Sequence, residues 1–381
     1  MSNPLTASFS DSMGEPMRTA VLLDDGVGTG IPGPDPGVIA GRVDASLHSF
    51  LSEKASDGEL GQFAELLREC LLAGGKRIRP VLCVLGWRAA GGAGDADLVY
   101  RWAASLELFH LFALIHDDIM DDSATRRGRP TVHWQMAARH PHGAGVPAAD
   151  RFGRNSAILI GDLALVWAEE MLHVGPLAAG HRAAAARRLV DQMRAEVMAG
   201  QYLDLAATGR VGCPVADVLR IAQLKTAKYT VERPLQIGAA LGGADGGLLR
   251  HCSEFAMPLG EAFQLRDDLL GVFGDPRCSG KPVLDDLREG KPTIVLAVAY
   301  ERATPGQRDT LRDLVGRPDL DQDGAARVRQ ILTALQVPQA VEELITARYR
   351  RALDALDQGP FAQPAAASLR TIADAIVSRS A

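Results

Sequence analysis

The chain has 381 residues, of which 47% are hydrophobic and 23% are charged, so one large domain or two modest ones with a sizeable core are expected. Its 41 basic and 47 acidic side chains give a formal net charge of −6, which disfavours nucleic acid as a main partner. Aromatic residues make up only 5% and alanine is abundant, a balance that favours helices over sheets.

The cysteines are scattered and show no Cys-x-x-Cys spacing, which argues against a disulfide scaffold or a structural zinc site and is typical of a reducing compartment. They are Cys70, Cys83, Cys213, Cys252 and Cys278. The most apolar stretch, 157–179, is interrupted by Asp162, Glu169 and Glu170, so no membrane span is predicted. The N-terminus lacks the basic-then-apolar order of a secretory signal. A soluble cytoplasmic protein is therefore expected.

Residues 1–40 are predicted to form a flexible tail, because positions 26–37 are mostly glycine and proline. Residues 41–381 are expected to form one all-α domain, since apolar residues recur at three- and four-residue spacing from about residue 43 onward. The predicted helical stretches are 63–72, 98–119, 156–172, 184–205, 218–241, 255–272 and 293–300. Residues 123–155, which are charged and glycine-rich, are predicted to form a long loop.

An acidic cluster ends the apolar helix predicted over 98–119. Asp117 and Asp121 lie four residues apart, so both carboxylates project from one face of the helix. Carboxylates at a helix C-terminus are unfavourable unless a cation offsets them. Mg²⁺ suits this spacing, because it takes one or two carboxylates and completes its shell with waters and phosphate oxygens. A solvated acidic helix end is the alternative for this motif alone.

A second acidic cluster lies in another apolar helical stretch. Gln264, Asp267 and Asp268 fall on one face of that predicted helix. Two such helices facing each other across a cavity could hold several Mg²⁺ ions, as diphosphate chemistry requires. Because two acidic clusters occur together, a metal–diphosphate site is favoured over two solvated helix ends.

Basic residues accompany the acidic clusters. They are Lys76, Arg77, Arg79, Arg126, Arg127, Arg129, Lys225, Lys228, Lys281 and Lys291. Guanidinium groups bind phosphate oxygens bidentately and lysine acts as a point charge, so these residues indicate anion sites, although singly each would be a solvated surface charge. His110 lies seven residues before Asp117 and so shares its side of the helix, with a satisfied core histidine as the alternative.

Seven motifs in order resemble the trans-isoprenyl diphosphate synthases, or polyprenyl synthetases, and most closely their bacterial geranylgeranyl diphosphate synthases. The motifs are GGKRIRP (74–80), LFHLFALIHDDIMDDS (108–123), RRGRPTVH (126–133), GQYLDL (200–205), KTAKYT (225–230), FQLRDDLLGVFGD (263–275) and GKPVLDDLREGKPT (280–293). The resemblance implies a single helical bundle around a deep apolar cavity, usually a homodimer, with residues 41–381 as the catalytic domain.

The resemblance also implies residue roles and three Mg²⁺ ions per active site. The implied metal ligands are Asp117, Asp121, Asp267 and Asp204, with Asp118 and Asp268 in support. The implied isopentenyl diphosphate site comprises Lys76, Arg79, His110 and Arg127. The implied allylic diphosphate site comprises Arg126, Lys225, Thr226, Gln264, Lys281 and Lys291. The residues expected to carry catalysis are Asp117, Asp118, Asp121, Lys225, Thr226, Gln264, Asp267 and Asp268.

The implied reaction joins isopentenyl diphosphate to a dimethylallyl, geranyl or farnesyl diphosphate. The allylic C–O bond ionises, the isopentenyl double bond attacks the carbocation, and a proton is lost to the released diphosphate. In this family, residues four and five positions before the first acidic motif form part of the floor of the elongation cavity. Here Ala113 and Phe112 occupy these positions, which implies geranylgeranyl diphosphate as product, with farnesyl diphosphate as the alternative. Ordinary core packing is the alternative role for Phe112.

Two positions depart from the family pattern. Gly271 stands where a third aspartate is usual, which implies a weaker field at that end of the cluster, and Leu284 replaces a frequent glycine, which implies a stiffer closing loop. A class I terpene cyclase would share the ionisation chemistry but would not need the second diphosphate site. An HD-type phosphohydrolase would need further histidines beyond His110 and His116. A non-catalytic partner subunit would typically lose the aspartates that this chain keeps.

Overall fold

The computed structural model describes residues 34–93, 96–140, 146–173, 180–210, 212–274 and 284–378. Residues 1–33, which make up most of the predicted tail, lie outside this described part, as do Lys281 and Cys278. The described cysteines, Cys70, Cys83, Cys213 and Cys252, are free thiols.

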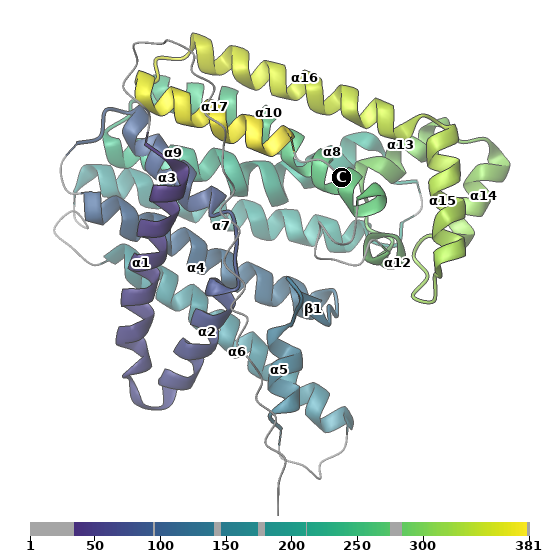
Figure 1. Cartoon of the computed structure of the whole chain (residues 1–381), viewed down its shortest axis with the longest axis horizontal. Helices are drawn as coiled ribbons and strands as arrows, with labels where there is room; N and C mark the ends of the chain where they lie inside the picture. The colour runs from purple at the N-terminus through teal and green to yellow at the C-terminus, as the bar shows by residue number, and fades with distance from the viewer. Residues whose placement is uncertain are drawn as a thin grey trace, which may run out of the picture. The chain divides into compact units, whose positions relative to one another are not determined.

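Helices dominate the described chain, so the predicted all-α class is confirmed (Figure 1). The first half contains α1 (Pro36–Ala55), η1 (Gly58–Leu60), α2 (Gly61–Leu72), α3 (Ile78–Ala89), α4 (Ala96–Met120), β1 (Thr125–Arg126), β2 (Arg129–Pro130), α5 (Val132–Ala138), α6 (Val146–His173) and α7 (His181–Ala207). The second half contains α8 (Val215–Ala222), the π-helix η3 (Gln223–Glu232), α9 (Arg233–Gly242), α10 (Gly246–Phe273), α12 (Asp285–Glu289), α13 (Ile294–Arg302), α14 (Pro305–Leu314), α15 (Gln322–Ala334), α16 (Val337–Gln358) and α17 (Gln363–Val377).

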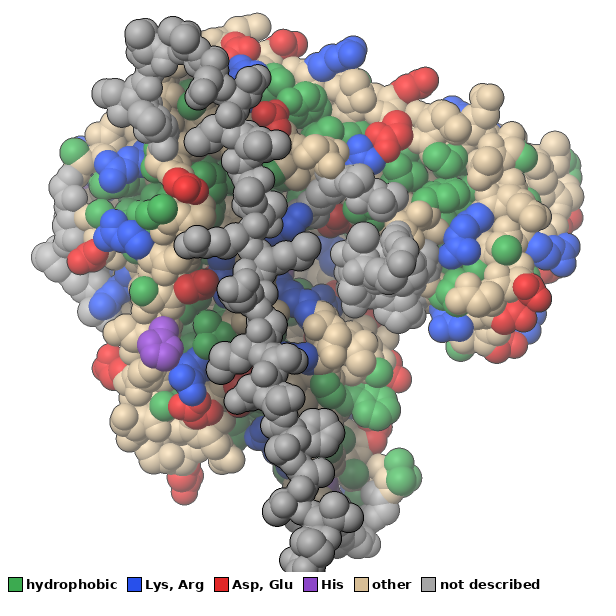
Figure 2. Space-filling view, viewed as in Figure 1, with side chains coloured by type: hydrophobic (Ala, Val, Ile, Leu, Met, Phe, Trp, Pro, Cys, Tyr) green, Lys and Arg blue, Asp and Glu red, His purple; other side chains and the backbone are tan. Residues whose placement is uncertain are grey.

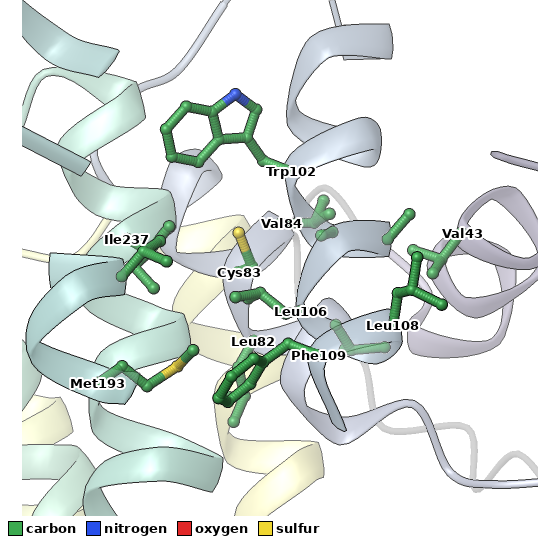
Figure 3. Packing of buried hydrophobic residues seen from close by; sticks show 14 of the residues in the cluster. Val43, Leu82, Cys83, Val84, Trp102, Leu106, Leu108, Phe109, Met193 and Ile237 are labelled. Atoms are coloured by element: carbon green, nitrogen blue, oxygen red, sulfur yellow. The ribbon is translucent and has the colours of Figure 1, made fainter. Parts of the chain in front are cut away.

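Helix α4 lies at the centre of the larger hydrophobic cluster and is buried on nearly every side over its first three-quarters. Figure 3 shows its side chains meeting those of α1, α3, α7 and α9. Trp102, Leu106 and Phe109 of α4 are each at most 2% exposed. By length and composition α4 could cross a membrane, but 67% of its most apolar window is buried inside the protein. A helix that is apolar all round and covered by other helices is a core helix.

A second hydrophobic cluster is formed by α8, α12–α16 and the C-terminal half of α10. Phe255 and Leu259 of α10 belong to the first cluster, whereas Leu265 and Leu269 belong to the second. Figure 1 shows α16 running alongside α10, and the two helices are in contact. Helix α10 therefore joins both clusters, and the second acidic motif lies on its second half.

Two expectations from the sequence differ from the structure. The boundary expected at residue 40 falls inside α1, which begins at Pro36 and buries Ile39, because proline is favourable at a helix start and Asp35 caps it by accepting from Gly37 N. The loop expected over 123–155 is wrong, because it contains the β1–β2 hairpin, α5 and the first turns of α6.

Candidate active site

A cavity of about 830 Å³ is lined by residues of α4, α7, α8, η3 and α10 and by the segments around Lys76 and Lys291. Many residues predicted from the sequence line it: Lys76, Arg79, His110, Ala113, Asp117, Arg126, Asp204, Lys225, Thr226, Gln264, Asp267, Asp268 and Lys291. Figure 2 shows Lys and Arg side chains gathered near the middle of one face of the molecule. The structure thus brings together residues from motifs that are far apart in the chain.

The first acidic motif lies at the end of α4 and is neutralised by cations from three other elements. Arg126 of β1 pairs with Asp117 at 3.2 Å and with the buried Asp118 at 2.6 Å. Lys225 of η3 lies 3.4 Å from Asp117, and Lys291 lies 2.9 Å from Asp121. The carboxylates thus have side-chain cations as partners, and the predicted binding of Mg²⁺ at this motif stays a prediction.

The π-helix η3 carries Lys225 and Thr226 into the cavity. Gly200 of α7 and Gly260 of α10 permit this approach, because a Cβ on Gly200 would lie 2.5 Å from Lys225 N and one on Gly260 would lie 2.5 Å from Ala227 Cα. The backbone of η3 is therefore held between α7 and α10. A side chain with a Cβ at either glycine would collide with the backbone of η3 at Lys225 or Ala227.

The charge of Lys225 is stabilised by two carboxylates. Its ammonium group lies 2.5 Å from Asp204 and 3.4 Å from Asp117. Burial by itself lowers the pKa of Lys225, but Asp117 and then Asp204 more than offset this and raise it. Lys291 behaves in the same way, because burial opposes its charge whereas Asp121 and Glu289 raise its pKa. Both lysines are thus fixed cations at neutral pH.

The adjacent aspartates of the second motif have different surroundings. Asp267 and Asp268 both line the cavity, but Asp268 is only 7% exposed and accepts hydrogen bonds from Ile294 N at 2.9 Å and from Gln264 Nε2 at 2.6 Å. Burial raises the pKa of Asp268 to about 7, and those hydrogen bonds oppose the rise. Gln264 in turn accepts from Thr226 Oγ1 at 2.5 Å. Asp268 therefore positions Gln264 and the start of α13.

A second basic group lines the cavity near α3. The Arg79 guanidinium donates to Thr230 Oγ1 at 2.7 Å and lies 4.2 Å from the Tyr229 ring centroid. His110 Nδ1 lies 3.1 Å from Tyr229 Oη. Burial, and then the charge of Arg79, lower the pKa of His110, so this imidazole is neutral at pH 7. Lys76 is exposed at the cavity wall.

The β1–β2 hairpin presents Arg126 and Arg127 in different directions. Its two central residues, Arg127 and Gly128, have φ of 54° and 73°, as a tight hairpin turn requires. Arg126 points to the first acidic motif, whereas Arg127 donates to Gly74 O in the segment before α3. Arg127 therefore lies beside the Lys76 segment, although it is not among the described residues that line the cavity.

Arg77, the third cation of the first basic motif, is part of the scaffold. It is 5% exposed and donates to Asp44 Oδ1 at 2.7 Å, Glu107 Oε1 at 2.9 Å and Leu71 O at 2.7 Å. These bonds join α1, α2 and α4 and fix the segment between α2 and α3. Arg77 thereby holds the Lys76 segment in place.

The two predicted chain-length residues are separated in the structure. Ala113 lines the cavity together with Leu114, whereas Phe112 is not among its described lining residues. The Phe112 ring packs 5.3 Å from that of Phe109 and 4.6 Å from that of His116. His116 Nε2 lies 3.4 Å from Asp162, so this histidine points to α6, and it is not among the described residues that line the cavity.

Sequence reasoning missed several residues that line the cavity. They are Gln201, Tyr229, Thr230, Asp286 and Glu289. All lie inside motifs quoted above, but their neighbours come from distant parts of the chain. Gln201 Nε2, for example, donates to Asp117 Oδ1 at 3.1 Å across α7 and α4. Tyr229 lies four residues after Lys225, and this spacing is a signal that could have indicated Tyr229 from the sequence.

The donor set fits a magnesium–diphosphate complex. Within the described residues, no three potential side-chain ligands are close enough to hold a metal ion by themselves. Asp117, Asp121 and Asp267 offer only oxygen, and Mg²⁺ binds through one or two carboxylates and takes its other ligands from waters and phosphates. Lys225, Lys291 and Arg126 add fixed positive charge for the same anion.

Comparison with known proteins identifies relatives of this chain. The family model for polyprenyl synthetase matches residues 61–334. A geranylfarnesyl diphosphate synthase of Aeropyrum pernix is 34% identical over 76% of this chain and 85% of the relative, and a (2E,6E)-farnesyl diphosphate synthase of Mycobacterium bovis is 34% identical over 68% and 67%. The crystal structure of a geranylgeranyl pyrophosphate synthase of Corynebacterium glutamicum, complexed with isoprenyl diphosphate and magnesium, matches with a TM-score of 0.82 and 36% identity over 91% of this chain and 98% of that one.

Proposed function

The chain belongs to the polyprenyl synthetase family and is a trans-prenyltransferase, and we propose that it elongates an allylic diphosphate to geranylgeranyl diphosphate. Its substrates are isopentenyl diphosphate and an allylic diphosphate. Members of the family are soluble Mg²⁺-dependent enzymes, and we assign this one to the cytoplasm. We further propose three Mg²⁺ ions per active site, with Asp117, Asp121, Asp204 and Asp267 as the carboxylates that hold them.

The proposal is supported chiefly by two groups of basic side chains that line one cavity. Lys225 and Lys291 lie with the acidic motifs, whereas Lys76, in the segment before α3, and Arg79, in the first turn of α3, line another part of the cavity. A terpene cyclase, which ionises one diphosphate substrate, has no use for the second group. Two groups of basic side chains suit a reaction between two diphosphates, because each substrate needs its own charge-assisted contacts.

The chain's own residues supply positioning and charge for the reaction. Bound Mg²⁺ would stabilise the departing diphosphate as the allylic C–O bond breaks. Lys225, Lys291 and Thr226 bind that diphosphate from η3 and the segment before α13, and the neutral His110 with Arg79 orients isopentenyl diphosphate for attack. Attack leaves a carbocation on the isopentenyl unit, and the adjacent carbon loses a proton to form the new double bond. The released diphosphate accepts that proton, since no side-chain base is assigned. The reaction requires that water be kept from the carbocation, because water would quench it to an alcohol.

Product length rests on the shape of the cavity beside the first acidic motif. Ala113 lines the cavity and contributes only a methyl group, which leaves room for the growing chain. The names of the relatives span farnesyl, geranylgeranyl and geranylfarnesyl diphosphate, three successive lengths. Because the small side chain of Ala113 admits a chain longer than farnesyl, we favour the middle product. For Phe112 a role in chain length stays a prediction.

We also propose a homodimer, because apolar side chains are exposed in stripes on two helices. On α6, Leu159 is 70% and Val166 is 59% exposed, and on α7, Met198 is 48% and Tyr202 is 71% exposed. Such patches on a folded protein mark interaction surfaces. Leu159→Glu is expected to convert a dimer into a monomer in size-exclusion chromatography with light scattering. A wild-type monomer would contradict the proposal.

A substrate-omission experiment tests the function. Purified protein is incubated with geranyl diphosphate, isopentenyl diphosphate and Mg²⁺, and diphosphate release is measured with each component left out in turn. We expect release only in the complete mixture, since attack by the isopentenyl double bond makes ionisation productive. Release from geranyl diphosphate alone, with a hydrocarbon product, would instead identify a cyclase.

A further inference from the structure

Lys228 of η3 is a cation whose contacts lie outside the cavity. Four other residues of η3 line the cavity: Lys225, Thr226, Tyr229 and Thr230. Lys228 and Glu232 are not among the described lining residues, and Lys228 Nζ lies 3.1 Å from Glu232 and 3.3 Å from Glu196 of α7. Lys228, which the sequence grouped with the expected anion-binding cations, therefore belongs to an ion-pair network instead.

Arg233, the first residue of α9, completes this network. Its guanidinium donates to both carboxylate oxygens of Glu196, through Nε at 2.8 Å and through Nη2 at 2.7 Å, and lies 3.8 Å from the buried Glu232. Burial by itself raises the pKa of Glu196, but Arg233 and then Lys228 more than offset this and lower it. Two cations thus balance two carboxylates, and removing one member leaves a buried charge without its partner.

The network accompanies the wide backbone turn of η3. The backbone hydrogen bonds of a π-helix span five residues, as Arg233 N does when it donates to Lys228 O. Pro234 disfavours the narrower α-helical turn here, because proline has no N–H and its ring clashes with the carbonyl four residues before it. In an α-helix, Glu232 would lie only about 20° around the axis from Lys225 and would share its face. In the wider helix Lys225 lines the cavity and Glu232 does not.

We propose that Glu196 is a positioning residue for the diphosphate site and that it acts through Lys228 and Arg233. The network stabilises the wide turn of η3, which directs Lys225 into the cavity and keeps the Glu232 carboxylate out of it. A carboxylate turned toward a bound diphosphate would repel it, because both carry negative charge. None of the four members of the network lines the cavity, so their effect passes through the orientation of η3. This inference rests on the proposed function.

Removing charges from the network tests the proposal. The variants are Glu196→Gln, Glu232→Gln and the double variant that carries both substitutions. The probe is inorganic diphosphate with Mg²⁺, and titration calorimetry measures its dissociation constant. Thermal unfolding of each variant without ligand measures the accompanying change in stability. Glu169→Gln is the matched control, because it breaks an ion pair between α6 and α7, the Glu169–Arg194 pair.

Glu196→Gln is expected to bind diphosphate about tenfold more weakly, the order of effect for a like charge a few ångströms from an anion. Adding Glu232→Gln removes that charge, so the double variant is expected to return to within about threefold of wild-type affinity, because neighbouring substitutions couple. Its melting temperature should nevertheless fall further, since two buried cations lose their carboxylates. A residue with a purely structural role would not show affinity and stability moving in opposite directions.

Three results would overturn the proposal: wild-type affinity in Glu196→Gln, a double variant that binds as weakly as Glu196→Gln, or an equal loss of affinity in the control Glu169→Gln. If Glu196→Gln does not fold, Lys228→Met makes the same test, because it leaves Glu196 paired with Arg233 but removes the cation at 3.1 Å from Glu232. Its diphosphate binding is expected to weaken and to recover when Glu232→Gln is added, and failure to recover would contradict the inference. A wild type that does not bind diphosphate with Mg²⁺ would instead overturn the proposed function.

Discussion

Replacing Asp117 with alanine separates the catalytic role of the first acidic motif from its structural role. The Asp117 carboxylate pairs with Arg126 at 3.2 Å and with Lys225 at 3.4 Å. After its removal Arg126 keeps Asp118 at 2.6 Å, and Lys225 keeps Asp204 at 2.5 Å. Because each cation retains a carboxylate partner, Asp117→Ala leaves no buried charge uncompensated, and the fold is expected to survive.

The expected magnitudes differ sharply for stability and for turnover. The Asp117 side chain is 20% exposed, and two partly exposed ion pairs lost together lower the free energy of unfolding by about 1–2 kcal/mol. A group that stabilises charge appearing only in the transition state is worth far more to the reaction, so kcat is expected to fall about 100- to 1000-fold.

Two measurements are needed. Urea unfolding, monitored by circular dichroism, gives the free energy of unfolding, and the rate of diphosphate release at saturating substrate concentrations gives kcat. Asp122→Ala is the matched control, because Asp122 follows the same helix, is 64% exposed and pairs with Arg154 at 2.7 Å instead of with a cavity residue. The control is expected to keep wild-type turnover. Near-normal turnover in Asp117→Ala would refute the metal assignment, and global unfolding of that variant would refute the charge-compensation argument.

Three further predictions concern substrate binding, product length and pH. Arg127→Ala should raise KM for isopentenyl diphosphate, and Lys225→Ala should mainly impair use of the allylic substrate. Each variant loses a charge-assisted contact worth about 1.5–3 kcal/mol. If both variants weakened the same substrate equally, the predicted division into two diphosphate sites would be wrong. Ala113→Phe should shift the product to farnesyl diphosphate by filling the cavity, while Phe112→Ala tests by its product distribution whether that ring limits chain length or only packs in the core. In metal-free protein, unfolding free energy should fall as pH rises from about 4 to about 7, because buried Asp268 keeps its proton up to a pKa of about 7 in the fold but loses it near 3.8 when unfolded; a slope unchanged in Asp268→Asn would contradict this.

The helices and the acidic motifs could be predicted from the sequence because both depend on local spacing. The run that ends in Asp117 and Asp121 forms α4, and Gln264, Asp267 and Asp268 share one face of α10, as four-residue spacing requires. Periodicity also located most of the core. These features need no knowledge of what each helix packs against.

The features that the sequence did not reveal depend on contacts between distant segments. The hairpin at Arg126 requires a non-glycine residue, Arg127, in the left-handed region, which sequence preference argues against. The charged composition of 123–155 concealed α5 and the start of α6. Asp267 and Asp268 are adjacent and look alike in the sequence. The hydrogen bonds that Asp268 accepts from Ile294 N and Gln264 Nε2 are visible only in the structure.

Gly271 is another position whose surroundings could not be predicted from the sequence. The sequence reveals that the third aspartate is absent, and it predicts a weaker field at that end of the motif. Only the packing of α12 against α10 brings the Asp286 carboxylate into the space above Gly271. Spacing within the motif cannot reveal such a contact between two helices.

Mass spectrometry of the products formed from isopentenyl diphosphate with dimethylallyl, geranyl or farnesyl diphosphate tests whether this chain makes geranylgeranyl diphosphate. With Mg²⁺ present, each primer is expected to be extended to geranylgeranyl diphosphate and no further. Removal of Mg²⁺ with a chelator should abolish extension of all three primers. Hydrocarbon products, or recovery of every primer unextended by folded protein, would contradict the proposal that this chain makes geranylgeranyl diphosphate.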